Sequence, residues 1–313
     1  MTLHHEIQPL VGAVNAMNGG GEVALDATTL RHGFTGLCAL LGNGPADVLV
    51  DELVLGGLVA RRYIPRSLAD VDEHVGSPTL VWFHGGGWVI GSLDTHDALC
   101  RELAARSGVM VVAVDYRLAP EHTFPAAHLD AMAALTALIA DAGDLGVEPG
   151  AVAVGGDSAG ANLAIAVAAG AAHGHVPPVQ LQVLVYPVTD LADPGAHPSR
   201  RKNGQGYLLT DATLRFFAET YAPDGATRPS ELLSPLYAQD LSGRAPAVVV
   251  TAEYDPLRDE GDAFARRLGA AGVPTEHRCV EGAVHLFLQM VETSPAREQL
   301  DLLARSIRSR LVR

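Results

Sequence analysis

The chain is poor in cysteine, and this shortage excludes a protein built on disulfides. Its 313 residues hold three cysteines, Cys38, Cys100 and Cys279, which lie far apart and form no C-x-x-C pair. Disulfide frameworks use paired cysteines, so an odd and sparse set is typical of reduced thiols inside a cell. We therefore expect a cytoplasmic protein without disulfides.

Basic residues are also scarce, which excludes several charged partners. Lysine and arginine total 22 against 36 aspartate and glutamate residues, so the formal net charge is −14. Such a surface repels the phosphates of nucleic acids and anionic lipid headgroups. We therefore expect neither a nucleic-acid partner nor electrostatic docking on a membrane.

Long apolar runs and metal-binding patterns are missing as well. The most apolar stretch, Leu163–Ala172, is too short to span a bilayer. The N-terminus lacks the basic start and the apolar run of a signal peptide. Histidine, cysteine and aspartate residues do not cluster at the spacing of zinc ligands. The sequence therefore predicts no membrane anchor and no metal site.

What the chain does contain is 48% hydrophobic residues, enough for one large core with a smaller accessory part. Short runs rich in Val and Leu alternate with helical patterns. This alternation predicts an α/β fold with a mainly parallel sheet and helices on both faces. The expected strands are Thr79–Phe83, Val109–Val114, Ala151–Val154, Leu181–Val185, Ala247–Thr251 and Thr275–Val280. The expected helices are Thr95–Arg106, Ala126–Ala140, Ala161–Ala172, Asp259–Ala271 and Pro295–Leu311.

The first 47 residues lie outside that alternation. They carry two amphipathic helical patterns, with apolar stripes over residues 3–17 and 30–41. Short helices are marginally stable alone, so these stripes need a partner to cover them. We therefore expect residues 1–47 to pack as an accessory part on a main domain of residues 48–313.

Two further segments of the main domain do not follow the strand–helix alternation. It opens with strand patterns at Val48–Leu55 and Leu58–Ile64, and the intervening Gly56-Gly57 suits a two-residue hairpin turn. Later, residues 190–245 interrupt the alternation with a polar segment rich in Pro and Gly that holds one helical pattern, Asp211–Tyr221. This insertion is either a lid or an elaborated loop.

A serine stands at a strand–helix junction in the segment Gly156-Asp-Ser158-Ala-Gly160. An apolar strand leads directly in and an Ala-rich helix leads directly out, which is the context of a nucleophile elbow. The flanking glycines let strand and helix approach closely, and the helix N-terminus favours developing negative charge. An ordinary Gly-rich turn is the alternative, but the context favours Ser158 as a nucleophile.

A second Gly-rich loop, His84-Gly-Gly-Gly-Trp88, follows the strand Thr79–Phe83. Consecutive glycines expose backbone N–H groups, and acyl transfer needs such donors where charge develops on the carbonyl oxygen. We predict that the amides of Gly85, Gly86 and Ala159 form this oxyanion hole. A phosphate cradle would want a lysine or G-x-G-x-x-G spacing, and neither is present.

The acidic partner of such a serine comes after it in the chain and before the histidine. Asp255 follows the strand Ala247–Thr251, at the same edge of the sheet as Ser158. Asp259 and Glu260 suit the first turn of the next helix, where the helix dipole stabilises acidic groups. We therefore predict Asp255 as the catalytic acid.

Two histidines follow Asp255. His277 falls inside the last strand pattern, whereas His285 lies in the loop beyond it, which can reach over Ser158. We predict His285 as the general base towards Ser158, held in the correct tautomer by Asp255. We expect His84 to anchor its loop by hydrogen bonds instead.

Together these segments resemble the hormone-sensitive-lipase-like esterases, a family with the α/β-hydrolase fold. The matches are His84-Gly-Gly-Gly-Trp88, Tyr116-Arg-Leu-Ala-Pro-Glu-His-Thr-Phe-Pro125, Gly156-Asp-Ser-Ala-Gly160 with Asn162, and Asp255-Pro-Leu-Arg-Asp-Glu-Gly261. The resemblance implies an eight-stranded sheet and a helical cap built partly from the N-terminus. It also implies carboxylesterase activity on small-molecule esters with short to medium acyl chains, without a cofactor.

Two positions depart from the family pattern. The residue after His285 is Leu286, and the residue after the elbow is Ala161, where glycine is common in the family. Leu286 is expected to narrow the substrate pocket or alter the loop. Trp88 belongs either to the wall of that pocket or to the core.

The same machinery serves amidases, lactonases and deacetylases, so the sequence leaves these reactions open. A non-catalytic small-molecule receptor on the same fold is disfavoured, because such relatives commonly lose the histidine. This chain keeps Ser158, Asp255 and His285. The sequence does not decide between a monomer and a homodimer.

Overall fold

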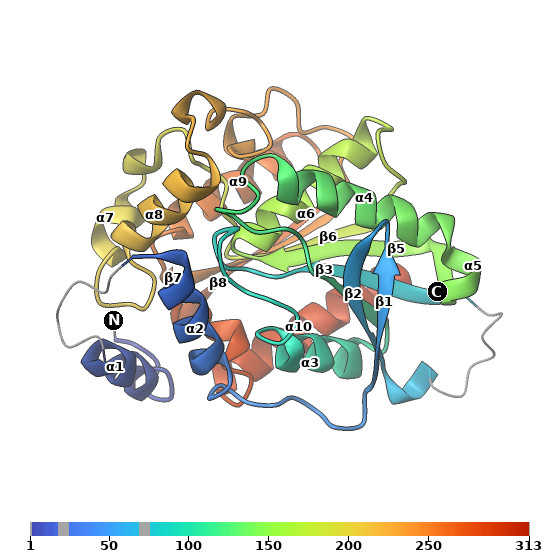
Figure 1. The fold of residues 1–313 in the computed structure, drawn as a ribbon, viewed down its shortest axis with the longest axis horizontal. Coiled ribbons are helices and arrows are strands. Elements are labelled where there is room, and N and C mark those ends of the chain that lie inside the picture. Colours follow the sequence, from blue (N-terminus) through green and yellow to red (C-terminus); the bar gives the residue numbers. More distant parts are fainter. Residues whose placement is uncertain (1, 18–24, 69–75, 313) are drawn as a thin grey trace.

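One twisted sheet runs through the middle of the molecule (Figure 1). The computed structural model describes residues 2–17, 25–68 and 76–312. The eight strands of these residues are β1 (Leu49–Leu55), β2 (Leu58–Ile64), β3 (Ser77–Phe83), β4 (Met110–Val114), β5 (Val147–Asp157), β6 (Leu181–Val185), β7 (Ala247–Tyr254) and β8 (Thr275–Val284). Their order is β1-β2-β4-β3-β5-β6-β7-β8. From β4 to β8 all neighbours are parallel, which confirms the mainly parallel sheet.

β1 and β2 form an antiparallel hairpin at one edge of this sheet. Leu55 pairs with Leu58, and the turn has φ of 58° at Gly56 and 88° at Gly57. A tight hairpin between twisted strands requires positive φ at both turn positions, and glycine adopts it without steric cost. The predicted hairpin is therefore confirmed.

Helices cover both faces of the sheet. Within the described residues they are α1 (Gln8–Met17), α2 (Ala27–Cys38), α3 (Asp97–Ser107), α4 (Ala126–Ala140), α5 (Ala142–Leu145), α6 (Ala159–Ala172), α7 (Pro198–Asn203), α8 (Asp211–Tyr221), α9 (Arg258–Ala270) and α10 (Ser294–Leu311). Val81 and Phe83 of β3 join the buried cluster of α4, α6 and α9, whereas Leu80 and Trp82 join that of α3 and α10. Figure 1 shows these two groups of helices on opposite sides of the sheet.

Several elements depart from the prediction: β7 and β8 extend to Tyr254 and Val284, and α5 has no predicted counterpart. β5 covers Val147–Asp157 rather than Ala151–Val154, because pairing with β6 carries the strand through residues 155–157, which have low strand propensity. The insertion holds α7 in addition to the predicted helix α8. α7 is a six-residue polar segment, so its sequence carries no apolar stripe that would indicate a helix.

The two N-terminal helices contact loops at the carboxyl edge of the sheet. Asn15 of α1 donates to the carbonyl oxygen of Gly206 in the insertion. Arg31 of α2 donates to the carbonyl oxygen of Val89, beyond the carboxyl end of β3. Phe34 is buried in the same cluster as α4 and α6, which covers the apolar stripe of α2. None of the described helices has the length and apolarity to cross a membrane.

Candidate active site

Ser158 occupies a strained turn between β5 and α6. Its φ is 56° and its ψ is −119°, a conformation that costs about 1–3 kcal/mol for a residue with a side chain. Added Cβ atoms would overlap the Phe83 carbonyl oxygen at Gly160 and the Gly160 backbone at Gly156. Both flanking glycines are therefore required for the close approach of strand and helix, as the sequence pattern indicates.

Asp255 and His285 form a buried pair beyond the ends of β7 and β8. His285 Nδ1 donates to Asp255 Oδ2 at 2.7 Å, and the backbone N–H of Leu257 donates to Asp255 Oδ1 at 2.8 Å. Asp255 is fully buried, and His285 is 3% exposed. With Nδ1 fixed as the donor, Nε2 of the neutral ring keeps the lone pair that a general base needs.

The end of β6 brings this pair together with the nucleophile turn. The Ser158 N–H donates to the Val185 carbonyl oxygen at 2.9 Å. The next residue, Tyr186, lies with its ring centroid 4.5 Å from that of His285. Among the described residues the Ser158 hydroxyl makes no hydrogen bond to His285. Catalytic hydrogen bonds often align only when substrate binds.

The competing histidine and acid have other partners. His277 Nε2 contacts Asp262 at 2.9 Å, and both side chains are partly exposed. Asp259 accepts a hydrogen bond from the Ser199 N–H and pairs with Arg258. These contacts join α9 to β8 and to α7, so both residues fasten elements to each other.

The oxyanion loop differs from the prediction at Gly85. The Gly85 N–H donates to Asp157 Oδ1 at 3.1 Å and lies 3.2 Å from His96 Nε2. It therefore does not face a substrate, and the prediction of Gly85 as a donor is wrong in this structure. The amides of Gly86, Gly87 and Ala159 meet no acceptor among the described residues, which leaves them as the candidate donors.

A family model described as the alpha/beta hydrolase fold matches residues 80–289. Ethyl acetate hydrolase of Pseudomonas putida is 39% identical over 301 residues, which is 93% of each chain. The chain belongs to the hormone-sensitive-lipase-like carboxylesterase family.

Other members of the family agree with this assignment. An arylesterase of Saccharolobus solfataricus is 41% identical over 214 residues, which cover 68% of this chain and 69% of the relative. The solved structure of a hyperthermophilic esterase from Pyrobaculum calidifontis is 37% identical, covers 99% of both chains and superposes with a TM-score of 0.90. The chain is thus an enzyme of the carboxylesterase family with the α/β-hydrolase fold.

In this family member a buried polar cluster joins the loops that carry Ser158, His285 and the three glycines after His84, and the sequence analysis did not predict it. Asp157, directly before Ser158, lies 3.1 Å from His96 Nε2. Gln289, four residues after His285, contacts the same His96 nitrogen at 2.8 Å. Burial alone would raise the pKa of Asp157, but His96 outweighs this effect and holds the pKa below its ordinary value. The position of Asp157 inside the elbow motif was the one available signal.

His84 anchors the oxyanion loop of this hydrolase, as expected. Its ring stacks on Tyr116 with centroids 4.2 Å apart, and the Tyr116 hydroxyl donates to the His84 carbonyl oxygen at 2.6 Å. Burial lowers the pKa of His84 to about 3, so the ring is neutral at ordinary pH. Tyr116 opens the family segment that runs to Pro125, which therefore supports this loop.

The two predicted pocket residues have different surroundings. Trp88 is 2% exposed and stacks on Tyr221 of α8 with centroids 4.8 Å apart, so it is packed in the core. Leu286 is half-buried and has a φ of 70°. The glycine usual in the family at this position is explained by that φ, which glycine adopts freely. A role of either side chain in binding substrate stays a prediction.

Buried acidic groups fasten the start of the insertion internally and to helix α9. Asp190 Oδ2 accepts hydrogen bonds from His197 Nε2 at 2.7 Å and from the Tyr237 hydroxyl at 2.9 Å. Glu260 Oε1 accepts the backbone N–H groups of Thr189 and Asp190. Burial raises the pKa of Glu260 to about 7. These contacts fix the chain where it leaves β6 and enters the insertion.

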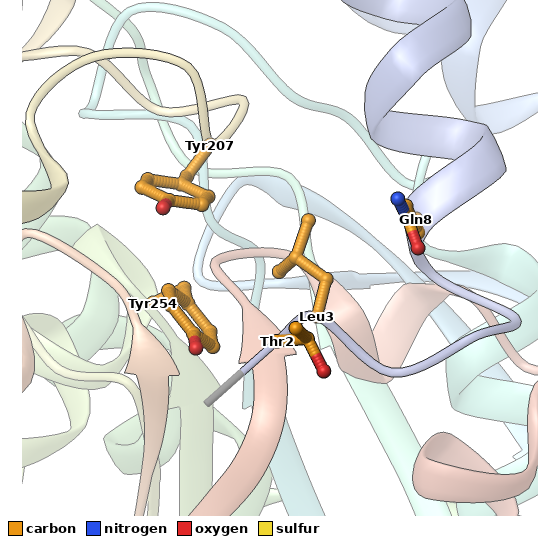
Figure 2. Close-up of a pocket in the computed structure, with 5 residues that line it drawn as sticks. All are labelled: Thr2, Leu3, Gln8, Tyr207 and Tyr254. Atoms are coloured by element: carbon orange, nitrogen blue, oxygen red, sulfur yellow. The ribbon is translucent and has the colours of Figure 1, made fainter.

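A cavity of about 260 Å³ lies between the N-terminal segment and the insertion. Thr2, Leu3, Gln8, Tyr207 and Tyr254 line it, and Figure 2 shows Leu3 beside the two tyrosine rings. The ring centroids of Tyr207 and Tyr254 are 5.0 Å apart. Because Tyr254 directly precedes Asp255, the N-terminal segment and the insertion meet beside the strand that carries the predicted acid.

Proposed function

We propose that the protein hydrolyses carboxylic esters through Ser158, His285 and Asp255, by way of an acyl-enzyme. The observation that carries the proposal is the buried His285–Asp255 hydrogen bond of 2.7 Å, made at the sheet edge where Ser158 holds a φ of 56°. A strained serine beside an oriented histidine is the arrangement of an activated nucleophile.

The first half of the reaction acylates the serine. His285 Nε2 takes the proton of the Ser158 hydroxyl as its oxygen attacks the ester carbonyl carbon. The carbonyl π electrons move to the oxygen, and the N–H groups of Gly86, Gly87 and Ala159 stabilise the resulting oxyanion. When the carbonyl re-forms, the bond to the alkoxide breaks and His285 gives it the proton. The alcohol leaves, and the acyl group stays on Ser158.

The second half removes the acyl group with water. His285 takes a proton from a water molecule, whose oxygen attacks the acyl carbon and rebuilds the same oxyanion. The bond to Ser158 then breaks, and the histidine returns the proton to the serine oxygen. Asp255 keeps the imidazole oriented and stabilises its cationic form in both halves.

We infer that residues 1–47 and the insertion 190–245 together form the cap over this site. Phe217 of α8 lies against Gly87, where an added Cβ atom would overlap its ring. α2 bonds to the same loop through Arg31 and Val89. A cap made of these two parts limits the space for the acyl chain, which favours short to medium chains.

The experiment that tests ester specificity is a series of p-nitrophenyl esters from two to twelve acyl carbons, measured beside the matching p-nitroanilides. We expect kcat/KM to peak at short to medium chains and to be at least about 100-fold lower for each anilide, because the amine is the poorer leaving group. The ethyl acetate hydrolase and arylesterase named above support ester over amide. Comparable anilide turnover would replace the proposal with an amidase.

A further inference from the structure

Arg31 of α2 makes an unusually complete set of hydrogen bonds for a residue of a cap helix. Its Nε donates to the carbonyl oxygen of Val89 at 2.9 Å, and one Nη2 bond reaches the carbonyl oxygen of Ala119 at 2.9 Å. The Nη1 and Nη2 groups also form a fork with Glu121 at 2.8 and 2.6 Å. This planar five-donor geometry is available to arginine but not to lysine.

The two backbone acceptors belong to segments that support the oxyanion loop. Val89 is two residues beyond Gly87, and it is fully buried. Its N–H donates to the Gly86 carbonyl oxygen at 3.1 Å, while the Ala119 N–H donates to the Trp88 carbonyl oxygen at 2.9 Å. Arg31 therefore binds both the loop and the turn at Ala119, whose N–H bonds to the same loop.

We propose that Arg31 is a positioning residue for the oxyanion hole, so that cap helix α2 contributes to transition-state stabilisation as well as to substrate choice. The inference rests on the proposed function, since it assigns Gly86 and Gly87 to the oxyanion. Preorganised donors act only when they are held where the charge develops, and small displacements cost large factors in rate. Loss of Arg31 therefore lowers kcat more than it raises KM.

An ordinary surface ion pair would behave differently. The side chains of Arg31 and Glu121 are 32% and 55% exposed, and exposed pairs contribute little by themselves. The hydrogen bond to Arg31 lowers the pKa of Glu121 to about 2, so the carboxylate is charged at ordinary pH. The bonds of Arg31 to the carbonyl oxygens of Val89 and Ala119 do not need Glu121. The positioning role and the ion pair can thus be separated by substitution.

Four variants test the proposal. Arg31→Gln removes the fork, Arg31→Lys keeps the charge alone, and Glu121→Gln keeps the backbone bonds of Arg31. Arg106→Gln is the matched control, because Arg106 pairs with Glu102 within α3 and with Asp301 of α10, away from the oxyanion loop. For each, we would measure kcat and KM on a short-chain p-nitrophenyl ester, the rate of phosphorylation by diethyl p-nitrophenyl phosphate, and Tm.

We expect Arg31→Gln and Arg31→Lys to lower kcat and the phosphorylation rate by about 10- to 100-fold, with KM within about twofold of wild type. Glu121→Gln should lose less than about threefold, and Arg106→Gln should match wild type. An unchanged kcat in Arg31→Gln would overturn the proposal, as would an effect confined to KM. Equal losses in Arg31→Gln and Arg106→Gln would assign the effect to general stability and also overturn it.

One readout does not depend on catalysis. The amides of Val89 and Ile90 donate to the Gly86 carbonyl oxygen, so amide hydrogen exchange at these two positions reports the order of the loop. Faster exchange there in Arg31→Gln, with unchanged exchange in α10, supports the positioning role. Unchanged exchange at Val89 and Ile90 would overturn it. If wild type hydrolysed no ester at all, the proposed function would fail, while this exchange result would still decide whether Arg31 orders the loop.

Discussion

Backbone strain in this protein is concentrated around the reaction centre. Among the described residues, five residues other than glycine have positive φ. Four of them, Trp88, Ser158, Tyr186 and Leu286, lie in or directly beside the loops of the candidate site. Each such residue costs about 1–3 kcal/mol and persists only where the surroundings enforce it. The packing that enforces these conformations therefore also fixes the loops on which the proposed chemistry depends.

Leu286 offers a direct measurement of that strain. Its φ of 70° costs a leucine about 1–2 kcal/mol, whereas glycine adopts it freely but loses about 0.5–1 kcal/mol through unfolded-state entropy. We expect Leu286→Gly to exceed Leu286→Ala in free energy of unfolding by about 0.5–1 kcal/mol, since both remove the side chain. Urea denaturation checks the order. An alanine variant as stable as the glycine variant would show that the position is unstrained.

Asp255 is predicted to act by holding His285. Asp255→Asn keeps the size of the side chain, but an amide cannot both fix the tautomer and stabilise the charged ring, so kcat should fall by about 10⁴. The control is Asp259→Asn, whose carboxylate binds Arg258 and the Ser199 N–H instead. Its kcat should stay within about threefold of wild type. The opposite ranking of the two variants would reassign the acid to Asp259.

Single residues could be predicted from the sequence where a local pattern carried them. The flanking glycines single out Ser158. The order of the residues in the chain and their positions beyond strands single out Asp255 and His285. The prediction of Gly85 as an oxyanion donor failed because the sequence does not distinguish the amides of three adjacent glycines. Which of them is occupied depends on the Asp157 side chain, 72 residues away. His96 has no local signal at all, since its partner is brought to it only by the packing of α3.

Helices and strands, too, could be predicted only where a local sequence pattern indicates them. Strands covered on both faces were predictable because continuous apolar runs have few alternatives. The helix α7 was not, because tertiary hydrogen bonds fix it rather than an apolar stripe. Arg200 pairs with Asp211 of α8, and the Ser199 N–H bonds to Asp259 of α9. The place of α7 within the insertion is therefore set by ion pairs and hydrogen bonds, which sequence periodicity does not report.

The pair of Asp190 and His197 makes this fastening depend on pH. The hydrogen bond to Asp190 raises the pKa of His197. Burial would raise the pKa of Asp190, but the bond to His197 outweighs it and lowers the pKa. A raised histidine pKa contributes stability that is fully present below about pH 6.5 and is lost as pH rises through the folded-state value. A lowered aspartate pKa contributes stability above about pH 4. The pair therefore stabilises the fold most between roughly pH 4 and pH 6.5.

We therefore expect His197→Gln to cost about 2 kcal/mol in free energy of unfolding at pH 6 and clearly less at pH 9. Glu260 also lies near His197, but its pKa of about 7 leaves it largely protonated at pH 6, so it attracts the cationic ring only weakly there. Urea denaturation of wild type and variant at the two pH values gives the difference directly. His277→Gln is the control, because its partly exposed pair with Asp262 lies on other elements. An equal cost of His197→Gln at both pH values would contradict the charged pair.

At the scale of the whole molecule, the site is assembled from groups far apart in the chain. The proposed nucleophile follows β5, the proposed acid follows β7, the proposed base follows β8, and the proposed oxyanion loop follows β3. Parallel strands bring these four carboxyl ends to one edge, where open α/β sheets bind their ligands. The two parts that we propose as the cap over this edge come from the N-terminus and from the insertion, and neither fits the strand–helix alternation.

The central claim is that Ser158 is the nucleophile, and covalent labelling of the wild-type protein tests it most directly. An organophosphate such as diethyl p-nitrophenyl phosphate should react once per chain and abolish ester hydrolysis in parallel, because its phosphorus is attacked by the activated serine. Mass spectrometry should place the adduct on Ser158, and Ser158→Ala should remain unlabelled. An adduct on another residue, or full ester hydrolysis in a protein that is stoichiometrically labelled at Ser158, would contradict the account.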